Sequence, residues 1–220
     1  MCPDSVDNDC DGSTDEGCAF PAVVGAEDYD AKLYGESLSD SFGNSLAGGF
    51  DFNEDGTEDI IVGATGDDDG GINYGAVYLY TGDLAAGVFN ATTNEYLKFY
   101  GTSTYDSVGT DVWAMPDLDS DGDGEFFTYS DTSTHKAHLV RGPTGGSNTI
   151  SNGDYAVHTC DQVAWAGGSN AVSGDDDWLC GLSVSSTATG QVVVYSGYAT
   201  AAGTLLGETT YDYAGAALGV

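Results

Sequence analysis

The chain repeats itself, and the interval of the repeat limits the folds that are open to it. Shifting the sequence by 66 residues aligns segment 32–43 with segment 98–109, with Lys, Tyr, Gly, Ser, Asp, Ser and Gly at matching positions. A weaker copy spans residues 206–215. Repeats then start at intervals of 66, 55 and 51 residues, at Phe42, Val108, Val163 and Ala214. An interval of this length fits about four strands and their turns, and it indicates a stacked or radial architecture.

Each repeat runs through the same order of segments. In the first repeat, a short stretch at 45–50 leads into an acidic loop and then into a buried strand at 59–64. A Gly-rich connection and an alternating strand at 75–82 follow, and a strand at 96–100 completes the unit. The later counterparts of the alternating strand are residues 137–142 and 191–197. Four antiparallel strands per unit predict the blade of a β-propeller, while β-sandwich stacks and β-solenoids fit less well. The expected fold class is therefore all-β.

An acidic loop of nine residues occurs three times, and its spacing predicts a metal site. Oxygen ligands occupy positions 1, 3, 5 and 9, and glycine at position 6 permits a sharp turn. Alternate residues of a curled loop direct their carboxylates to one centre, where Ca²⁺ takes six to eight oxygens. Acidic turns that bind no ion are the alternative. The predicted ligands are Asp51, Asn53, Asp55, Thr57 and Asp59 in one copy, Asp117, Asp119, Asp121, Asp123 and Glu125 in the next, and Asp7, Asp9, Asp11 and Asp15 in the N-terminal copy.

These loops differ from an EF-hand, which carries glutamate at position 12 between two helices. Position 12 here is Val62, Thr128 or Cys18, and a strand-like run, Ile-Ile-Val-Gly-Ala, follows Asp59. We expect about two structural Ca²⁺ ions in the repeats and one more in the N-terminal copy.

The charge of the chain excludes several classes of partner. Lys and Arg together number 4 against 36 Asp and Glu, which gives a net charge of −32. Nucleic acids and anionic membrane surfaces need basic residues, so neither is an expected partner. Direct membrane insertion is not expected either, because no run of 18 apolar residues exists. The excess of negative charge suits a solvated surface in an extracellular or salty setting.

The five cysteines suit an oxidising compartment. None forms a Cys-x-x-Cys motif, so zinc and thioredoxin chemistry have no support, and Cys160 with Cys180 is the expected disulfide. One of Cys2, Cys10 and Cys18 must stay free or pair outside this sequence. This odd count, and a start without signal-peptide features, favour a sequence that begins inside a longer protein over one whose signal has been removed.

In the first repeat, Phe42-Gly43 precedes the acidic loop and Gly63-Ala64-Thr65 follows it. These residues resemble the FG-GAP repeat of the integrin α-subunit β-propeller and its bacterial relatives, with Phe42-Gly43 as the "FG" and Gly63-Ala64-Thr65 as the "GAP", in which Thr replaces Pro. The second repeat matches in part. In the third, Val163-Ala164 replaces Phe-Gly, and segment 169–177 keeps neither the length nor the acidic pattern of the loop, so no calcium is expected there. The resemblance covers residues 20–220 and implies a propeller, usually of seven blades, with Ca²⁺ in hairpin loops.

Residues 1–19 form a separate segment. Segment 6–18 resembles a short Cys-containing metal-binding motif of secreted and surface proteins of bacteria. It is too small for a core and would depend on Ca²⁺ or a disulfide for order, and the alternative is a disordered acidic linker.

The expected domains are thus this N-terminal motif and blades at 20–220, about three of them plus the start of a fourth at 214–220. Such a set cannot close a ring of at least four blades, so we expect further blades beyond Val220. Segment 31–35 matches a fourth blade strand and could close the ring on the last blade.

No catalytic constellation is recognisable. His135, His138 and His158 have no evident partner and fit surface or strand positions, and the nucleophile and phosphate-loop motifs are missing. The acid runs 67–69 and 175–177 suit solvated turns. Trp113, Trp165 and Trp178 would fit either a sugar-stacking surface or blade cores.

The chain is therefore expected to be an extracellular or cell-surface, calcium-binding propeller without enzymatic activity. It would act as an adhesion or protein-interaction scaffold with a protein or glycan ligand on a propeller face. The alternatives are a carbohydrate-binding propeller module and an accessory domain of a larger secreted hydrolase.

Overall fold

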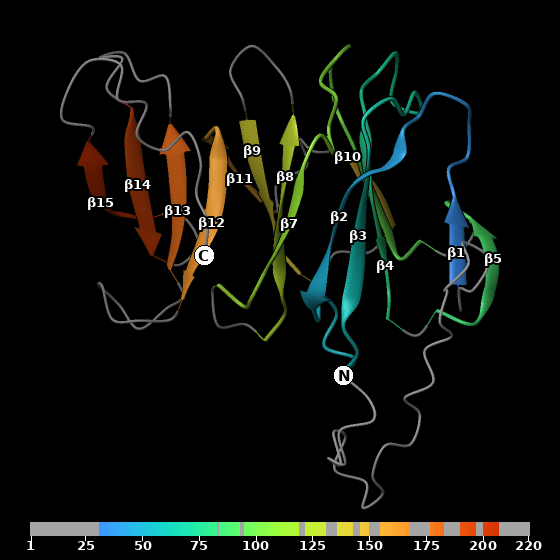
Figure 1. The fold of residues 1–220 in the computed structure, drawn as a ribbon, viewed down its shortest axis with the longest axis horizontal. Coiled ribbons are helices and arrows are strands. Elements are labelled where there is room, and N and C mark those ends of the chain that lie inside the picture. Colours follow the sequence, from blue (N-terminus) through green and yellow to red (C-terminus); the bar gives the residue numbers. More distant parts are fainter. Residues whose placement is uncertain are drawn as a thin grey trace, which may run out of the picture.

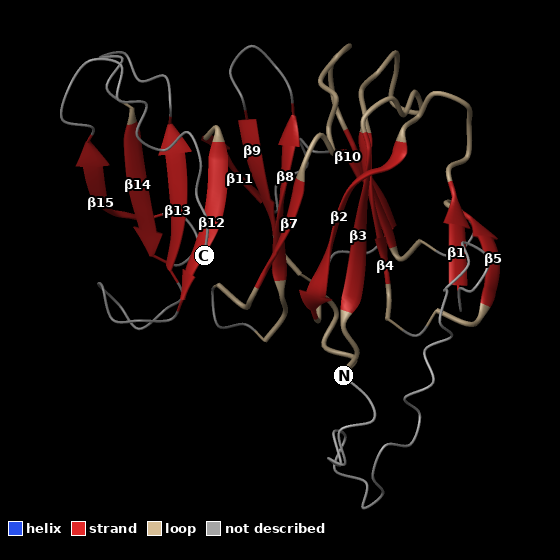
Figure 2. Cartoon of the chain, in the orientation of Figure 1, coloured by secondary structure: helices blue, strands red, loops and turns tan. Residues whose placement is uncertain are grey.

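All regular structure in the described part of the chain is β-strand (Figures 1 and 2). The computed structural model describes residues 31–82, 84–92, 95–118, 122–130, 136–142, 146–149, 155–167, 177–182, 190–196 and 200–206. Within these ranges there are fifteen strands, and no helix is long and apolar enough to cross a membrane. The expectation of an all-β chain is confirmed.

Three units of four antiparallel strands follow one another along the chain and stand side by side in Figure 1, and the sheet of the first unit has a fifth strand at its edge. The first contains β2 (Phe42–Phe50), β3 (Asp59–Ala64), β4 (Ala76–Tyr80) and β6 (Leu97–Tyr100). The second contains β7 (Val112–Met115), β8 (Glu125–Ser130), β9 (Lys136–Val140) and β11 (Tyr155–Thr159). The third contains β12 (Gln162–Gly167), β13 (Asp177–Leu182), β14 (Gln191–Ser196) and β15 (Thr200–Leu206). Closure of such sheets into a propeller stays a prediction.

Two parallel pairings were not expected from the sequence. Strand β10 (Gly146–Thr149) returns from the second repeat and pairs with β6 at the edge of the first sheet. Strand β1 (Ala31–Tyr34) pairs with β5 (Gly87–Asn90), which lies in the connection between β4 and β6. The ring-closing hypothesis for segment 31–35 would require β1 to pair with the last blade. In this structure β1 pairs with β5 instead.

Strand β4 differs from the alternating strand that we expected. All five of its residues are buried, because both faces of the first sheet are covered. Val77 and Leu79 face the core shared with the second sheet, whereas Tyr78 and Tyr80 pack on the opposite side, where Phe42 makes edge-on contacts with both rings (5.4 and 6.4 Å between centroids). Buried on both faces, β4 has no solvent-facing polar row.

The strand register corrects the alignment of the third repeat. Val62, Thr128 and Cys180 hold equivalent places in β3, β8 and β13, and their partners on the preceding strands are Leu46, Val112 and Val163. Val163 therefore corresponds to Leu46 and Val112, not to Phe42 and Val108. The sequence alignment was wrong by four residues because the third repeat lacks the Phe-Gly that would have fixed it.

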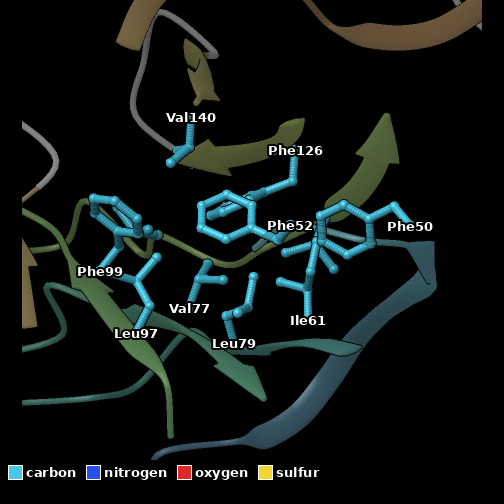
Figure 3. Close-up of a cluster of buried hydrophobic side chains, with 11 residues drawn as sticks. Phe50, Phe52, Ile61, Val77, Leu79, Leu97, Phe99, Phe126 and Val140 are labelled. Atoms are coloured by element: carbon cyan, nitrogen blue, oxygen red, sulfur yellow. The ribbon is translucent and has the colours of Figure 1, made fainter. Parts of the chain in front are cut away.

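Aromatic residues fill the core between the first and second sheets (Figure 3). Phe52 and Phe126 are fully buried with ring centroids 5.7 Å apart, and Phe99 packs on Phe126 at 6.0 Å. Full burial of each such side chain contributes about 1.5–3 kcal/mol. A second cluster, which includes Met115, Leu139 and Trp178, fills the space between the second and third sheets.

Glycines let the first two sheets approach closely between β3 and the segment that precedes β7. Gly109 has φ 83°, and a Cβ at Gly63 would collide with the Gly109 carbonyl and the Ser45 hydroxyl. Ser45 Oγ donates a hydrogen bond to that carbonyl (2.8 Å). Gly63 of the "GAP" segment is thus required by packing against the next repeat.

The expected disulfide is present. Cys160 and Cys180 are joined with Cα atoms 5.4 Å apart, which links the segment before β12 to β13. The N-terminal motif 1–19, with Cys2, Cys10 and Cys18, and the start of a fourth repeat at 214–220 lie outside the described residues.

Candidate metal centre

The first acidic loop joins β2 to β3 and closes on the carboxylate at its first position. Asp51 Oδ1 accepts a hydrogen bond from the backbone N–H of Asp55 (3.2 Å), and Asp51 Oδ2 accepts one from the N–H of Gly56 (2.9 Å). Gly56 has φ 87°, a left-handed conformation that favours glycine. Positions 1, 5 and 6 thus produce a tight turn whose backbone N–H groups are satisfied by a side chain.

Two further polar residues, Asn53 and Thr57, gather around Asp55 at position 5. Asn53 Nδ2 donates to Asp55 Oδ2 (3.0 Å), and Thr57 donates to Asp55 Oδ1 through its backbone N–H (2.8 Å) and through its hydroxyl. These hydrogen bonds lower the pKa of Asp55; the Thr57 hydroxyl has the largest effect, followed by the Thr57 N–H and the Asn53 amide. The predicted ligands at positions 1, 3, 5 and 7 therefore lie together, and the carboxylate at position 5 is held ionised.

Asp59, at position 9, is fully buried and anchors the base of the loop. Its Oδ2 accepts from the N–H of Phe52 (2.8 Å), and its Oδ1 accepts from the N–H of Gly82 (3.1 Å). Burial raises the pKa of Asp59, and repulsion from Asp55 and Asp51 adds to the rise against the two hydrogen bonds. A cation near these three acids would relieve this repulsion.

The second loop, between β7 and β8, repeats two of these hydrogen bonds at the same positions. Gly122 N–H donates to Asp117 Oδ2 (2.9 Å), which pairs position 6 with position 1. Leu118 N–H donates to the fully buried Glu125 through Oε2 (2.6 Å), which pairs position 2 with position 9. Asp123, at position 7, is also buried. Asp119 and Asp121 lie outside the described residues.

The two loops contact each other directly. The N–H of Gly124 in the second loop donates to the carbonyl of Asp51 in the first (2.8 Å). The Glu54 carboxylate lies against Gly122, in the space that a side chain there would occupy. Phe52, the second residue of one loop, packs on Phe126, which directly follows the other. A change in the conformation of one loop should therefore alter the other loop.

The third copy of the loop keeps more than the sequence alignment indicated. Asp177 begins β13 opposite Gly167, just as Asp59 faces Phe50 and Glu125 faces Met115. With Asp177 as position 9, Gly174 falls at position 6 in the sequence. The paired residues Val163 and Cys180 are 17 positions apart, against 16 for Leu46 and Val62 and for Val112 and Thr128, so the third connection is one residue longer and the expected change of length holds. The carboxylates at positions 1, 3 and 5 are replaced by Ser, Ala and Ser.

The N-terminal copy, with Asp7, Asp9, Asp11 and Asp15, falls outside the described residues.

The donor chemistry of the first loop fits Ca²⁺. Its carboxylate, amide and hydroxyl groups offer oxygen atoms only, which is what this hard cation prefers. The acids of the loop do not lie as close together as the cluster of Glu36, Asp40 and Asp67, whose oxygens are within 4.8 Å of one another in the described part of the chain. The loop acids are spread because they accept backbone N–H groups along the turn.

That closer cluster lies at the opposite end of the first sheet, and sequence reasoning missed it. Asp67, expected in a solvated turn, is fully buried and accepts a hydrogen bond from the Tyr78 hydroxyl (2.6 Å). Lys98 Nζ lies 2.9 Å from Asp67, 2.7 Å from Asp69 and 3.8 Å from Glu36. One of the four basic residues of the chain thus serves as the cation of this cluster. The scarcity of basic residues was the only feature of the sequence that could have drawn attention to Lys98.

The pKa values of the cluster follow from burial and pairing. Burial would lower the pKa of Lys98, but hydrogen bonds to Asp69 and Asp67 outweigh it and the pKa is raised. The Lys98 hydrogen bond lowers the pKa of Asp69. Burial raises the pKa of Glu36 and of Asp40, with repulsion from neighbouring carboxylates adding to it.

These raised values predict how stability depends on pH. A carboxyl with a folded pKa above its unfolded value binds protons more tightly in the fold, so acidification stabilises the fold through that window. With chelator present, we expect the urea midpoint to rise as the pH falls from neutral toward the ordinary carboxyl pKa range, near about 4. Asp111, whose pKa burial also raises, supplies the test: Asp111→Asn should be more stable than the parent at pH 7, and its midpoint should rise less than that of the parent on acidification. A midpoint that falls steadily over this range would contradict this prediction.

The structure also places the remaining candidates. His138 is buried in β9, where its Nε2 lies 3.1 Å from Ser130 Oγ and burial lowers its pKa to about 4. His158 lies on β11, and His135 is outside the described residues. Trp113 packs edge-on against Tyr129, and Trp178 is fully buried against Phe127 and Tyr195. These two indoles therefore serve core packing.

Comparison with known proteins supports the repeat. No curated protein matches the sequence. Repeats of the FG-GAP type are units of β-propeller domains that take part in protein interactions. Residues 42–80, which comprise β2, the first acidic loop, β3 and β4, match the FG-GAP repeat.

Proposed function

We propose that the chain is part of a calcium-stabilised β-propeller that acts outside the cell as a non-catalytic interaction scaffold. The observation that carries this proposal is the recurrence of one loop geometry at equivalent strand connections. In both loops a position-6 N–H binds the carboxylate at position 1, and a position-2 N–H binds the acid at position 9. Random acidic turns would have no reason to share both bonds.

Calcium has a structural role in this proposal. Asp51, Asn53, Asp55 and Thr57 would hold the ion of the first loop, with Asp59 at its base, and the second site would be built on Asp117, Asp123 and Glu125 together with Asp119 and Asp121. Bound Ca²⁺ supplies the positive charge that offsets repulsion among these carboxylates. The protein side chains fix the hairpins, and the contact between the two loops joins neighbouring sheets.

The partner-binding surface is proposed at the opposite end of the sheets, on the loops 35–41, 66–75 and 101–107. Backbone hydrogen bonds tie these loops together, from Gly66 to the Asp40 carbonyl (3.0 Å) and from Tyr105 to the Ile72 carbonyl (3.2 Å). Three large apolar side chains there are more than half exposed, namely Leu38, Ile72 and Tyr105. Exposed apolar groups on acidic loops suit a protein partner with basic and apolar residues.

Backbone conformation singles out the same three loops. Six non-glycine residues of the described chain have φ in the left-handed region, and five of them lie in these loops: Ser39, Ser41, Asn73, Tyr105 and Ser107. Such conformations cost about 1–3 kcal/mol each and cluster at binding sites.

An extracellular location is proposed because the Cys160–Cys180 disulfide and a net charge of −32 both suit it. Loops that bind calcium weakly would also be filled at the millimolar calcium found there.

Calorimetric titration with Ca²⁺ after removal of divalent ions tests the metal sites. We expect saturable binding that is much stronger for Ca²⁺ than for Mg²⁺, and Asp51→Asn should weaken one class of site at least tenfold. Glu58→Gln removes one charge from an exposed loop position outside the predicted ligand set and serves as the control. Equal binding by the parent and Asp51→Asn would contradict the proposal.

A further inference from the structure

One tryptophan of the three is not used in core packing. Trp165, on β12, is 43% exposed, and no other aromatic ring contacts it in the part of the chain that the structure describes. Its neighbour across the strand pair is Trp178, so both point to the side of the third sheet that faces the second. Trp178 is enclosed there, whereas Trp165 remains open.

Trp165 lines a pocket that all three sheets contribute to. The pocket has a volume of about 430 Å³, within the range of about 300–1,000 Å³ usual for small-molecule sites. Phe50 and Asp51 come from the end of β2, Met115 and Asp117 from the end of β7, and Trp165 from β12. The pocket therefore lies at the end of the sheets that carries the acidic loops, away from the loops 35–41, 66–75 and 101–107.

The backbone around the pocket is shaped to leave room. Gly48, Gly49, Gly122 and Gly124 line it, so much of its wall is main chain. Two of the strands that reach it carry β-bulges, between Gly48 and Phe50 in β2 and between Trp165 and Gly167 in β12. Bulges redirect side chains and are frequent next to binding sites.

The chemistry of the lining selects one class of ligand. An open indole face takes a flat apolar surface, and Asp51 and Asp117, the first residues of the two acidic loops, add oxygen acceptors for hydroxyl groups at the edge of the pocket, beside the oxygens that the proposed Ca²⁺ ions would take. A pyranose ring offers both, with C–H groups on its face and hydroxyls on its rim. Acidic sugars would be repelled, since none of the described residues that line this pocket is Lys or Arg and the chain carries a charge of −32.

We propose that the pocket between Trp165, Asp51 and Asp117 binds a neutral sugar residue of a glycan, stacked on the Trp165 indole. The site is separate from the proposed protein-binding loops and does not depend on them. It adds a glycan-binding function at the opposite end of the sheets.

The test uses the full chain at saturating Ca²⁺, so that the acidic loops are in one state. Neutral oligosaccharides of glucose, mannose and galactose are titrated while the three indole N–H signals are followed by NMR, with a sialylated oligosaccharide as the anionic probe. We expect at least one neutral probe to shift the Trp165 signal saturably. Trp165→Ala should weaken its binding roughly tenfold or more, Trp165→Phe should weaken it less, and the sialylated probe should bind more weakly.

Tyr34→Ala, which removes an exposed aromatic ring on β1, is the matched control and should bind like the parent. Each variant is first compared with the parent by its melting curve, and Trp165→Phe keeps the test valid if the alanine variant is poorly folded. The proposal is overturned if no neutral probe binds, if the Trp165 variants bind like the parent, or if the sialylated probe binds as tightly as its neutral counterpart.

Discussion

Chelation of divalent ions is expected to lower the melting temperature of the chain by roughly 5–10 °C for each calcium site that is emptied. An ion present at about 100 times its dissociation constant stabilises the folded state by about 2.7 kcal/mol, and about 1 kcal/mol shifts the melting temperature of a chain of this size by about 2–4 °C. Without the cation, the buried acid Asp59 again faces the carboxylates of Asp51 and Asp55. Differential scanning calorimetry in calcium and in EDTA measures the shift.

The variant Asp55→Ala should remove most of this shift for the first loop. Asp55 organises positions 3, 5 and 7 but is exposed, so its loss leaves the buried base at Asp59 in place. Glu58→Ala removes a carboxylate from the same loop without removing a predicted ligand, and it should respond to EDTA like the parent. A parent melting curve that EDTA leaves unchanged would count decisively against structural calcium.

Local patterns made part of this structure predictable. The strand at 59–64 was expected with the bounds that β3 has, because a continuous apolar run follows an acidic turn. The turn itself depends on residues five apart, with Gly56 and Asp51 joined by a hydrogen bond. The Cys160–Cys180 disulfide was expected as the likeliest single bridge among the five cysteines, and it is present.

Features that depend on distant segments were missed. The parallel pairings of β10 with β6 and of β1 with β5 join stretches separated by about 50 residues, and no local pattern encodes them. The third repeat was aligned four residues away from its true register because only a short apolar match was available there. Strand pairing with β13 supplied the missing constraint.

Burial of charge was the least predictable property of the candidate sites. The run 67–69 reads as a polar turn, yet Asp67 is enclosed because Tyr78 and Lys98, 11 and 31 residues further along, cover it. The sequence shows only that residues 67–69 are all acidic. The side chains packed around each carboxylate decide whether it belongs to a buried ion pair or to a solvated turn.

Replacing Lys98 with methionine is expected to cost about 3–5 kcal/mol of folding free energy, the usual result of removing one partner from a buried ion pair. The side chain of Lys98 is 4% exposed and that of Asp67 is 0% exposed, so solvent cannot take over the role of the ammonium group. Methionine keeps the length and apolar stem of lysine, which limits the loss to charge and hydrogen bonding. Urea denaturation at pH 7 gives the difference from the parent.

Lys136→Met, at an exposed lysine at the start of β9, is the matched control and should change stability by less than about 0.5 kcal/mol.

The pH dependence adds a second test. The pKa of Asp69 is lowered in the fold, so Asp69 stabilises the parent at pH values above the unfolded Asp pKa, and this contribution is lost as the pH falls through the folded pKa. The pKa of Lys98 is raised, so its contribution is lost only when the pH rises into the alkaline range. In the variant, acid would instead neutralise carboxylates left without their cation. The loss of folding free energy in Lys98→Met should therefore be largest near neutral pH and shrink below about pH 4. A loss equal to that of Lys136→Met, or a loss independent of pH, would show that the ammonium group does not hold this cluster.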